Sequence, residues 1–236
     1  MNRLSALLGW CTLVSTLWCA APALAFEDSI AQRVQACTGC HGKLGRAASD
    51  GYYPRIAGKP AGYLYNQLIN FRDGRRQYPL MTQLVDPLSD AYLQEIANYF
   101  AGLDVPYPEP QPATVMPAVL ARGEALVSRG DSARRIPACV QCHGQALTGV
   151  APAIPGLLGL PRDYLVAQLG AWKTGNRRAA SPDCMAEIAR ALSPDDVSAV
   201  SQWLGAQAIP VQAKAVAQLP APLPKPCGGV AVEAQR

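Results

Sequence analysis

The pattern of hydrophobic and polar positions predicts helices along most of the chain. An early segment places three apolar residues on one helical face: Ile30, Val34 and Cys37. Further on, Pro60 and Gly74 bracket a second helix. Its inward-facing residues are Leu64, Leu68 and Phe71. We find no convincing strand pattern, so each half of the chain is expected to form three or four helices joined by loops.

Two later helices carry clear start signals. Ser89 is a good N-cap, and Leu88 and Leu93 are spaced to pack together as a hydrophobic staple. The second half repeats this arrangement, with Ser193 as the cap and Pro194 at the first helical position. The apolar residues of that helix are Leu192, Val197, Val200 and Leu204.

An internal repeat organises the chain. The first half contains Cys37-Thr38-Gly39-Cys40-His41, and the second contains Cys139-Val140-Gln141-Cys142-His143. Tyr63, Leu64, Gln67, Leu68 and Gly74 are matched by Tyr164, Leu165, Gln168, Leu169 and Gly175. The offset is 102 at the histidines, 101 through the middle and 104 at Met81 and Met185. Because the halves differ only by short loop insertions, they are expected to share one fold.

The repeat and two proline-rich segments divide the chain. Residues 26–104 and 118–208 are the two predicted domains. Residues 105–117 contain five prolines and are predicted to form a semi-rigid linker. Residues 209–236 are rich in Pro, Ala and Val without a period, which is typical of an extended tail.

Residues 1–25 are typical of a secretory signal peptide. Arg3 precedes an apolar run over residues 4–18, and Ala23-Leu24-Ala25 supplies the small residues of a cleavage site. An uncleaved anchor is the alternative, because the apolar run is nearly long enough to span a bilayer. We therefore expect a mature protein that lies in the periplasm.

Charge excludes one class of function. The chain has 21 basic and 17 acidic residues, a formal net charge of +4 at pH 7. The predicted signal peptide removes Arg3, and the remaining basic residues are scattered along the chain. Such a small surplus does not indicate nucleic-acid binding.

Each C-x-x-C-H motif is the signature of covalent haem attachment. The two thiols lie one helical turn apart and can add to the two vinyl groups on one porphyrin edge, with the adjacent histidine under the ring. A thioredoxin-like pair would need a βαβ context, and a zinc site would need four convergent ligands. We expect two covalently bound haem c groups. The predicted attachment residues are Cys37, Cys40, Cys139 and Cys142, and the predicted proximal ligands are His41 and His143.

Methionine is the predicted ligand on the opposite side of each iron. His41 and His143 are the only histidines in the chain, so bis-His coordination is excluded. Met81 lies 40 residues after His41, and Met185 lies 42 residues after His143. Both are expected on a loop before the capped final helix, where a thioether would favour the reduced iron. Met116, in the linker, has no counterpart in the repeat.

Both halves resemble class I cytochrome c domains, and their tandem arrangement resembles the periplasmic dihaem cytochromes of the c-four group. The resemblance rests on the two haem motifs and covers about residues 28–206. It implies an all-α fold of two tandem class I cytochrome c domains that face each other about a pseudo-twofold axis. A terminal oxidase is a common electron acceptor in this group.

The resemblance also implies roles around each haem. Pro54 and Pro155 match the proline whose carbonyl accepts a hydrogen bond from the proximal imidazole, which would orient the ring. The alternative is that these prolines only shape a loop. Ile56 and Leu157 would then be apolar haem contacts.

Four arginines follow the second helix of the two halves: Arg75, Arg76, Arg177 and Arg178. Basic side chains at a helix C-terminus complement the helix dipole. Beside a haem edge, the same side chains can pair with propionates. Both interpretations stay open from the sequence.

Two cysteines remain after the signal peptide and the haem motifs are accounted for. Cys184 adjoins Met185, and Cys227 lies in the tail. Because an exported protein meets an oxidising compartment, we predict a disulfide that holds the tail across the second half. The alternatives are a free thiol at Cys227 that crosslinks two chains, and Cys184 as a weaker rival to Met185 for the iron.

These features favour an electron carrier over an enzyme, because His/Met coordination leaves no open iron position for a substrate. We expect a periplasmic one-electron carrier between a donor complex and a terminal oxidase or reductase. The alternative is a cytochrome subunit of a haem-containing oxidoreductase, such as a dehydrogenase or a thiosulfate-oxidising enzyme. The expected partners are redox proteins, a respiratory complex or a terminal oxidase, through which the chain would associate peripherally with a membrane.

Overall fold

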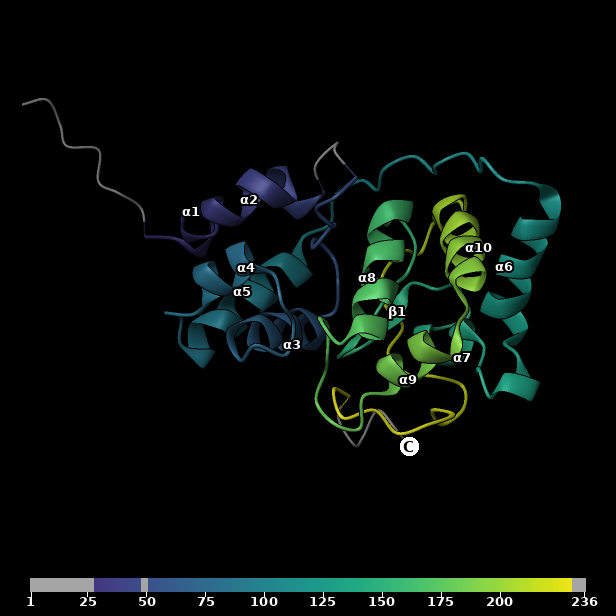
Figure 1. Cartoon of the computed structure of the whole chain (residues 1–236). Coiled ribbons are helices and arrows are strands. Elements are labelled where there is room, and N and C mark those ends of the chain that lie inside the picture. Colours follow the sequence, from purple (N-terminus) through teal and green to yellow (C-terminus); the bar gives the residue numbers. More distant parts are fainter. Residues whose placement is uncertain (1–27, 48–50, 231–236) are drawn as a thin grey trace, which may run out of the picture.

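The computed structural model describes residues 28–47 and 51–230, which form two halves that lie side by side (Figure 1). The predicted signal peptide lies outside the described residues. The first half contains α1 (Ile30–Arg33), α2 (Gln35–His41), the 3-10 helix η1 (Lys43–Gly45), α3 (Ala61–Arg72), α4 (Pro79–Val85) and α5 (Asp90–Gly102). The second half contains α6 (Pro117–Arg129), the 3-10 helix η2 (Ser132–Arg134), α7 (Cys139–His143), β1 (Gly149–Val150), β2 (Ile154–Pro155), α8 (Arg162–Thr174), α9 (Cys184–Ala191) and α10 (Pro194–Gly205).

The two predicted helix caps are confirmed. At the start of α5, the side chain of Ser89 accepts a hydrogen bond from the backbone N–H of Tyr92. At the start of α10, Ser193 and Asp196 form a capping box, and Pro194 lies in the first turn. These caps satisfy backbone N–H groups that have no partner inside the helix.

The first predicted helix is divided in two. Val34, with φ −87° and ψ 6°, separates α1 from α2. Ile30, Val34 and Cys37 nevertheless all pack into the core of the first half. Apolar spacing reports which face of a segment is buried, and it does not report a local departure from helical geometry.

The all-α fold class is confirmed, with one small addition. β1 and β2 pair in antiparallel fashion, with Gly149 opposite Pro155 and Val150 opposite Ile154. The expectation of no strand was therefore wrong. Each strand has only two residues, which is too short for an alternating pattern to be visible in the sequence.

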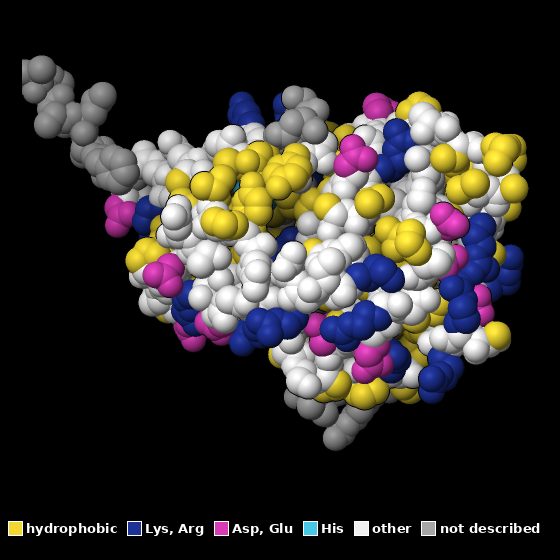
Figure 2. All heavy atoms as spheres, viewed as in Figure 1, with side chains coloured by type: hydrophobic (Ala, Val, Ile, Leu, Met, Phe, Trp, Pro, Cys, Tyr) yellow, Lys and Arg dark blue, Asp and Glu magenta, His cyan; other side chains and the backbone are white. Residues whose placement is uncertain are grey.

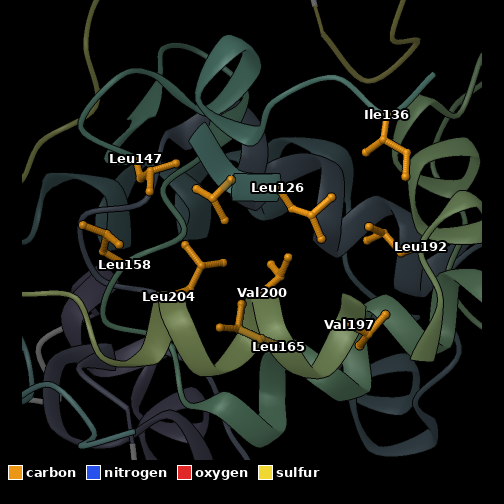
Figure 3. Close-up of a cluster of buried hydrophobic side chains, with 10 residues drawn as sticks. Leu126, Ile136, Leu147, Leu158, Leu165, Leu192, Val197, Val200 and Leu204 are labelled. Carbon is orange, nitrogen blue, oxygen red and sulfur yellow. The ribbon is translucent and has the colours of Figure 1, made fainter. Parts of the chain in front are cut away.

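Each half has its own hydrophobic core. In the first half, α3 packs against α5, and the cluster includes Leu93 and Phe100. In the second half, α10 packs against α6 and α8. Leu126, Val200 and Leu204 face one another there (Figure 3). Helices at equivalent positions of the repeat therefore build both cores.

The helices α6 and α10 cross at a glycine. A Cβ atom added at Gly123 would overlap the carbonyl oxygen of Ala199 and would lie 2.9 Å from the Cβ atom of Trp203. Only a residue without a side chain allows the two backbones to approach this closely.

Substitution Gly123→Ala should lower the free energy of unfolding by about 1–3 kcal/mol, because the added methyl group forces α6 away from α10. Thermal unfolding of the holoprotein measures this loss. Gly170→Ala in α8 is the matched control, because nothing lies within 4 Å of its added Cβ atom. Alanine there should stabilise the helix slightly. Equal midpoints for the two variants would contradict the close crossing.

The tail crosses the second half and reaches the first. Figure 1 shows it passing beneath α9. Val216 forms a parallel bridge with Val150 of β1, and the N–H of Ala151 donates to the carbonyl of Val216 at 2.8 Å. Farther along, the side chain of Asn66 in α3 donates to the carbonyl of Gly229 at 2.8 Å. The tail therefore contacts both halves.

The predicted disulfide between Cys184 and Cys227 is confirmed, and the two Cα atoms lie 5.1 Å apart. It joins the start of α9 to the tail. Beside it, the N–H of Gly228 donates to the carbonyl of Pro182 at 2.9 Å. The tail is thus fixed next to the helix that carries Met185.

Replacing both cysteines, as Cys184→Ser with Cys227→Ser, should lower the free energy of unfolding by about 4 kcal/mol in the chain-entropy account. The reason is that the bridge closes a segment with a sequence separation of 43 residues. Chemical denaturation of both proteins, with and without reductant, measures the difference. An unchanged midpoint in the double variant would show that the bridge does not stabilise the fold.

Candidate haem sites

The two attachment motifs occupy equivalent short helices. The first motif closes α2, which ends at His41, and the second forms the whole of α7. Glycines with positive φ follow, Gly42 at 74° and Gly144 at 83°, so the chain turns directly after each histidine. The motif cysteines are half-buried and form no disulfide: Cys37, Cys40, Cys139 and Cys142.

A proline carbonyl holds each histidine. Nδ1 of His41 lies 2.9 Å from the carbonyl oxygen of Pro54, and Nδ1 of His143 lies 2.7 Å from that of Pro155. A carbonyl oxygen only accepts, so Nδ1 carries the proton and Nε2 presents a lone pair. The histidines are only 8% and 7% exposed. Each imidazole therefore has the tautomer that an iron ligand requires.

Burial keeps both imidazoles neutral. Desolvation lowers the pKa of His41 and of His143 below the ordinary value, despite the opposing effect of the proline hydrogen bond. Metal coordination requires this neutral form. Burial also raises the pKa of Cys139 to about 12 and that of Cys142 to about 11.

Matching loops carry the predicted apolar contacts. The N–H of Ile56 donates to the carbonyl of Gly45 at 2.8 Å, and the N–H of Leu157 donates to that of Leu147 at 2.8 Å. Ile56 packs against the first core and Leu157 against the second. Their positions are equivalent, and their contact with haem stays a prediction.

The two methionines lie in short helices, whereas the sequence interpretation placed them on loops. Met81 belongs to α4, which begins with Pro79. Met185 belongs to α9, where the side chain of Asp183 accepts a hydrogen bond from the N–H of Ala186. Pro79 and Asp183 are helix-start signals that the interpretation overlooked. Both methionines are half-buried, and their role as ligands stays a prediction.

Two of the four arginines connect the halves. Arg76 of the first half donates to Gln168 of the second at 2.7 Å, and Arg177 donates to Gln67 at 3.0 Å. Each also donates to a tyrosine of the opposite half, at 3.1 Å and 3.4 Å respectively. The arginine backbones pair as an antiparallel bridge. These contacts are reciprocal, as a pseudo-twofold arrangement requires.

The sequence interpretation missed this interface role. The sequence contained evidence for it, because Gly74 and Arg76 recur as Gly175 and Arg177 at the offset of 101.

The other two arginines differ from each other in their contacts. Arg75 donates to neighbouring side chains at the end of its own helix, whereas Arg178 donates across the interface to the carbonyl of Gly74 at 3.3 Å.

Features of this interface fit a bound haem. The described hydrogen bonds of the Arg76 and Arg177 side chains go only to Tyr and Gln, and Arg177 is buried. Buried cations without a counter-ion are costly. Arg177 lies 3.8 Å from the ring centroid of Trp172, whose Nε1 is buried without a hydrogen-bond partner in the described residues. Haem propionates would pair with Arg76 and Arg177 and would accept a hydrogen bond from Nε1 of Trp172.

Apolar surface also lies near the first motif. Figure 2 shows hydrophobic side chains gathered over the first half around α2 and α4. Leu80 and Leu84 of α4 are 52% and 48% exposed. An apolar porphyrin is a suitable group to cover such surface.

Comparison with known proteins agrees with this geometry, although no protein-family model matches the chain. A "thiosulfate dehydrogenase electron acceptor" of Thiomonas intermedia is 38% identical over 192 residues, which cover 80% of this chain and 82% of that protein. A "cytochrome c4" of Pseudomonas aeruginosa is 34% identical over 197 residues, 82% of this chain and 95% of that protein.

Solved structures show the same similarity. Reduced cytochrome c4 from Pseudomonas stutzeri has a TM-score of 0.62 and 30% identity, and the match covers 74% of this chain and 95% of that one. A thiosulfate dehydrogenase from Marichromatium purpuratum has a TM-score of 0.65 and 33% identity. That match covers 72% of this chain but only 36% of the other.

The fold, the repeated motifs and the proline-held histidines define a two-domain, dihaem c-type cytochrome. By identity and coverage, this chain belongs to the cytochrome c4 family. It carries two covalently bound haem c groups and functions in electron transfer.

Proposed function

We propose that the chain is a periplasmic one-electron carrier, and not an enzyme, with His/Met coordination at both irons. The observation that carries the proposal is the buried, proline-held histidine in each half of a chain that has no third histidine. Methionine is the repeated thioether left for the opposite side. The proposed residues are Cys37, Cys40, His41 and Met81 for the first haem, and Cys139, Cys142, His143 and Met185 for the second.

Bound haem supplies a one-electron couple, and the residues of this chain set its surroundings. The hydrogen bonds that the histidines donate to the carbonyls of Pro54 and Pro155 fix the imidazole rings and make them better ligands. The methionine thioethers favour the reduced iron. Ile56 and Leu157 would be apolar contacts of the two haems. Histidine and methionine from the chain would hold each iron, which would leave neither iron with a site for a substrate.

Met81→Ala and Met185→Ala should each remove half of the Met–iron(III) charge-transfer band and lower one reduction potential, because a soft ligand to the reduced iron is lost. Absorption spectra and spectroelectrochemical titration of the holoproteins measure both effects. Met116→Ala is the control, because that side chain is 72% exposed in the linker. A full band in either ligand variant, or a loss of band in Met116→Ala, would refute the assignment.

One specific donor is favoured by the comparisons. Relatives from Thiomonas intermedia and Stutzerimonas stutzeri, 38% and 40% identical, are named thiosulfate dehydrogenase electron acceptors. We infer that this chain accepts electrons from a thiosulfate-oxidising dehydrogenase, as a free carrier or as its cytochrome subunit. A terminal oxidase or another respiratory complex is then the proposed acceptor.

Thiosulfate alone should leave the oxidised protein unreduced, because six-coordinate iron offers no binding site. Adding a thiosulfate dehydrogenase should reduce both haems, as measured by stopped-flow absorbance in the α-band. Reduction by thiosulfate without the dehydrogenase would contradict the carrier and favour an enzyme. Failure of the dehydrogenase to reduce the protein would instead exclude this donor.

We propose a periplasmic location from the predicted signal peptide. No helix in residues 28–47 and 51–230 is long and apolar enough to cross a membrane. Cleavage of residues 1–25 would release the chain into the periplasm, and any membrane association would be peripheral, through a redox partner.

A further inference from the structure

A buried lysine of the first half reaches the histidine support of the second. Nζ of Lys59 donates to the carbonyl of Gly156 at 2.9 Å, and Lys59 is 4% exposed. Gly156 directly follows Pro155, whose carbonyl holds His143. The ammonium group of Lys59 therefore lies one residue from the carbonyl that supports the predicted iron ligand of the second half.

The contacts around Lys59 fix its position. Lys59 and Pro60 precede α3, and the first turn of α3 lies against the turn between β1 and β2. There the N–H of Tyr63 donates to the carbonyl of Pro152 at 3.3 Å. A Cβ atom added at Gly62 would lie 2.8 Å from the same carbonyl oxygen. The loop that carries Lys59 is thus held against the second half by backbone contacts on its C-terminal side.

The charge of Lys59 has no carboxylate partner among the described residues. Its hydrogen-bond partner there is the carbonyl of Gly156. Arg55, four residues earlier, is also buried and donates to the carbonyls of Ala57, Val105 and Pro106. Two buried cations therefore lie in one short loop of the first half.

The second half has no equivalent cations. At the repeat offset of 101, Leu160 corresponds to Lys59, and Gly156 corresponds to Arg55. The interface arginines Arg76 and Arg177, in contrast, occupy equivalent positions. Lys59 consequently breaks the electrostatic symmetry of the two haem sites.

We propose that Lys59 is a tuning residue for the second haem, whose ammonium group raises the reduction potential of that haem relative to the first. Reduction of the iron removes one positive charge, so a nearby cation favours the reduced state. The proposal rests on the proposed electron-carrier function. It predicts that an electron shared between the two haems is drawn toward the second haem by the charge of Lys59.

A cavity of about 320 Å³ borders Lys59. The charged and titratable groups that line it are Arg55, Asp104, Tyr107 and Lys214. Burial, followed by repulsion from Arg55, lowers the pKa of Lys59 to about 7. The charge is present below that pH and is lost as the pH rises through it, so the effect on the second haem should be larger at pH 6 than at pH 8.5.

Spectroelectrochemical titration of holoprotein at pH 6 tests the proposal. Lys59→Met should shift the electron-sharing equilibrium away from the second haem on the order of tenfold, or about 59 mV for a one-electron couple. The first haem should shift less. Adding Met81→His to each protein separates the two one-electron reduction steps of the titration, because a second imidazole lowers the reduction potential of the first haem.

Two further variants separate charge from structure. Lys214→Met removes the same charge from the same cavity, but its side chain is 78% exposed and paired with Asp104 at 3.7 Å, so neither potential should move. Lys59→Gln keeps an N–H donor for Gly156 without the charge, and it should behave like Lys59→Met. If Lys59→Met fails to fold, Lys59→Gln replaces it in the same titration.

The outcomes are distinct. An equal shift of both potentials, an unchanged second potential, or a wild-type potential in Lys59→Gln would overturn the tuning role. If Met81→His lowers neither step, the methionine assignment fails instead. The Lys59→Met and Lys59→Gln variants without Met81→His then still test the role of Lys59, because they should shift the two reduction potentials unequally.

Discussion

The hydrogen bond from each histidine Nδ1 to a proline carbonyl is the interaction on which the site architecture depends. It spans 13 residues in the first half and 12 in the second, and it folds the loop after each haem motif back under its own histidine. This one contact selects the tautomer and orients Nε2. Because it is made by backbone, it tolerates different side chains around it, and the two sites can differ in charge while sharing one geometry.

The second organising feature is the reciprocal interface. Arg76 and Arg177 each reach a glutamine and a tyrosine of the opposite half, so neither half completes its surface alone. Domains of this size bury a modest share of their surface, and covalent cofactors and mutual packing compensate for that. The tail also connects the two halves, because it is joined to Cys184 of the second half by a disulfide and contacts Asn66 of the first half. Both sites are therefore held in fixed relation, which suits electron exchange between them.

The sequence predicted those features that depend on local pattern. The repeat, the caps at Ser89 and Ser193 and the all-α class follow from spacing and residue type, and the structure confirms them. The sequence did not predict the two-residue strands, the break at Val34 or the helices around Met81 and Met185. Each is short, and the hydrophobic pattern around it does not reveal it. The disulfide was predictable by elimination. The contacts of Arg76, Arg177 and Lys59 were not, since they depend on how two halves meet, which hydrophobic periodicity does not report.

The central claim is that each half holds its own haem through its own motif. Mass spectrometry of the exported protein, before and after acid-acetone extraction, tests this most directly. The account predicts the mass of the chain without residues 1–25 plus two haems, unchanged by extraction because both are bound through thioethers. A mass with a single haem, or haem that leaves with the solvent, would contradict it.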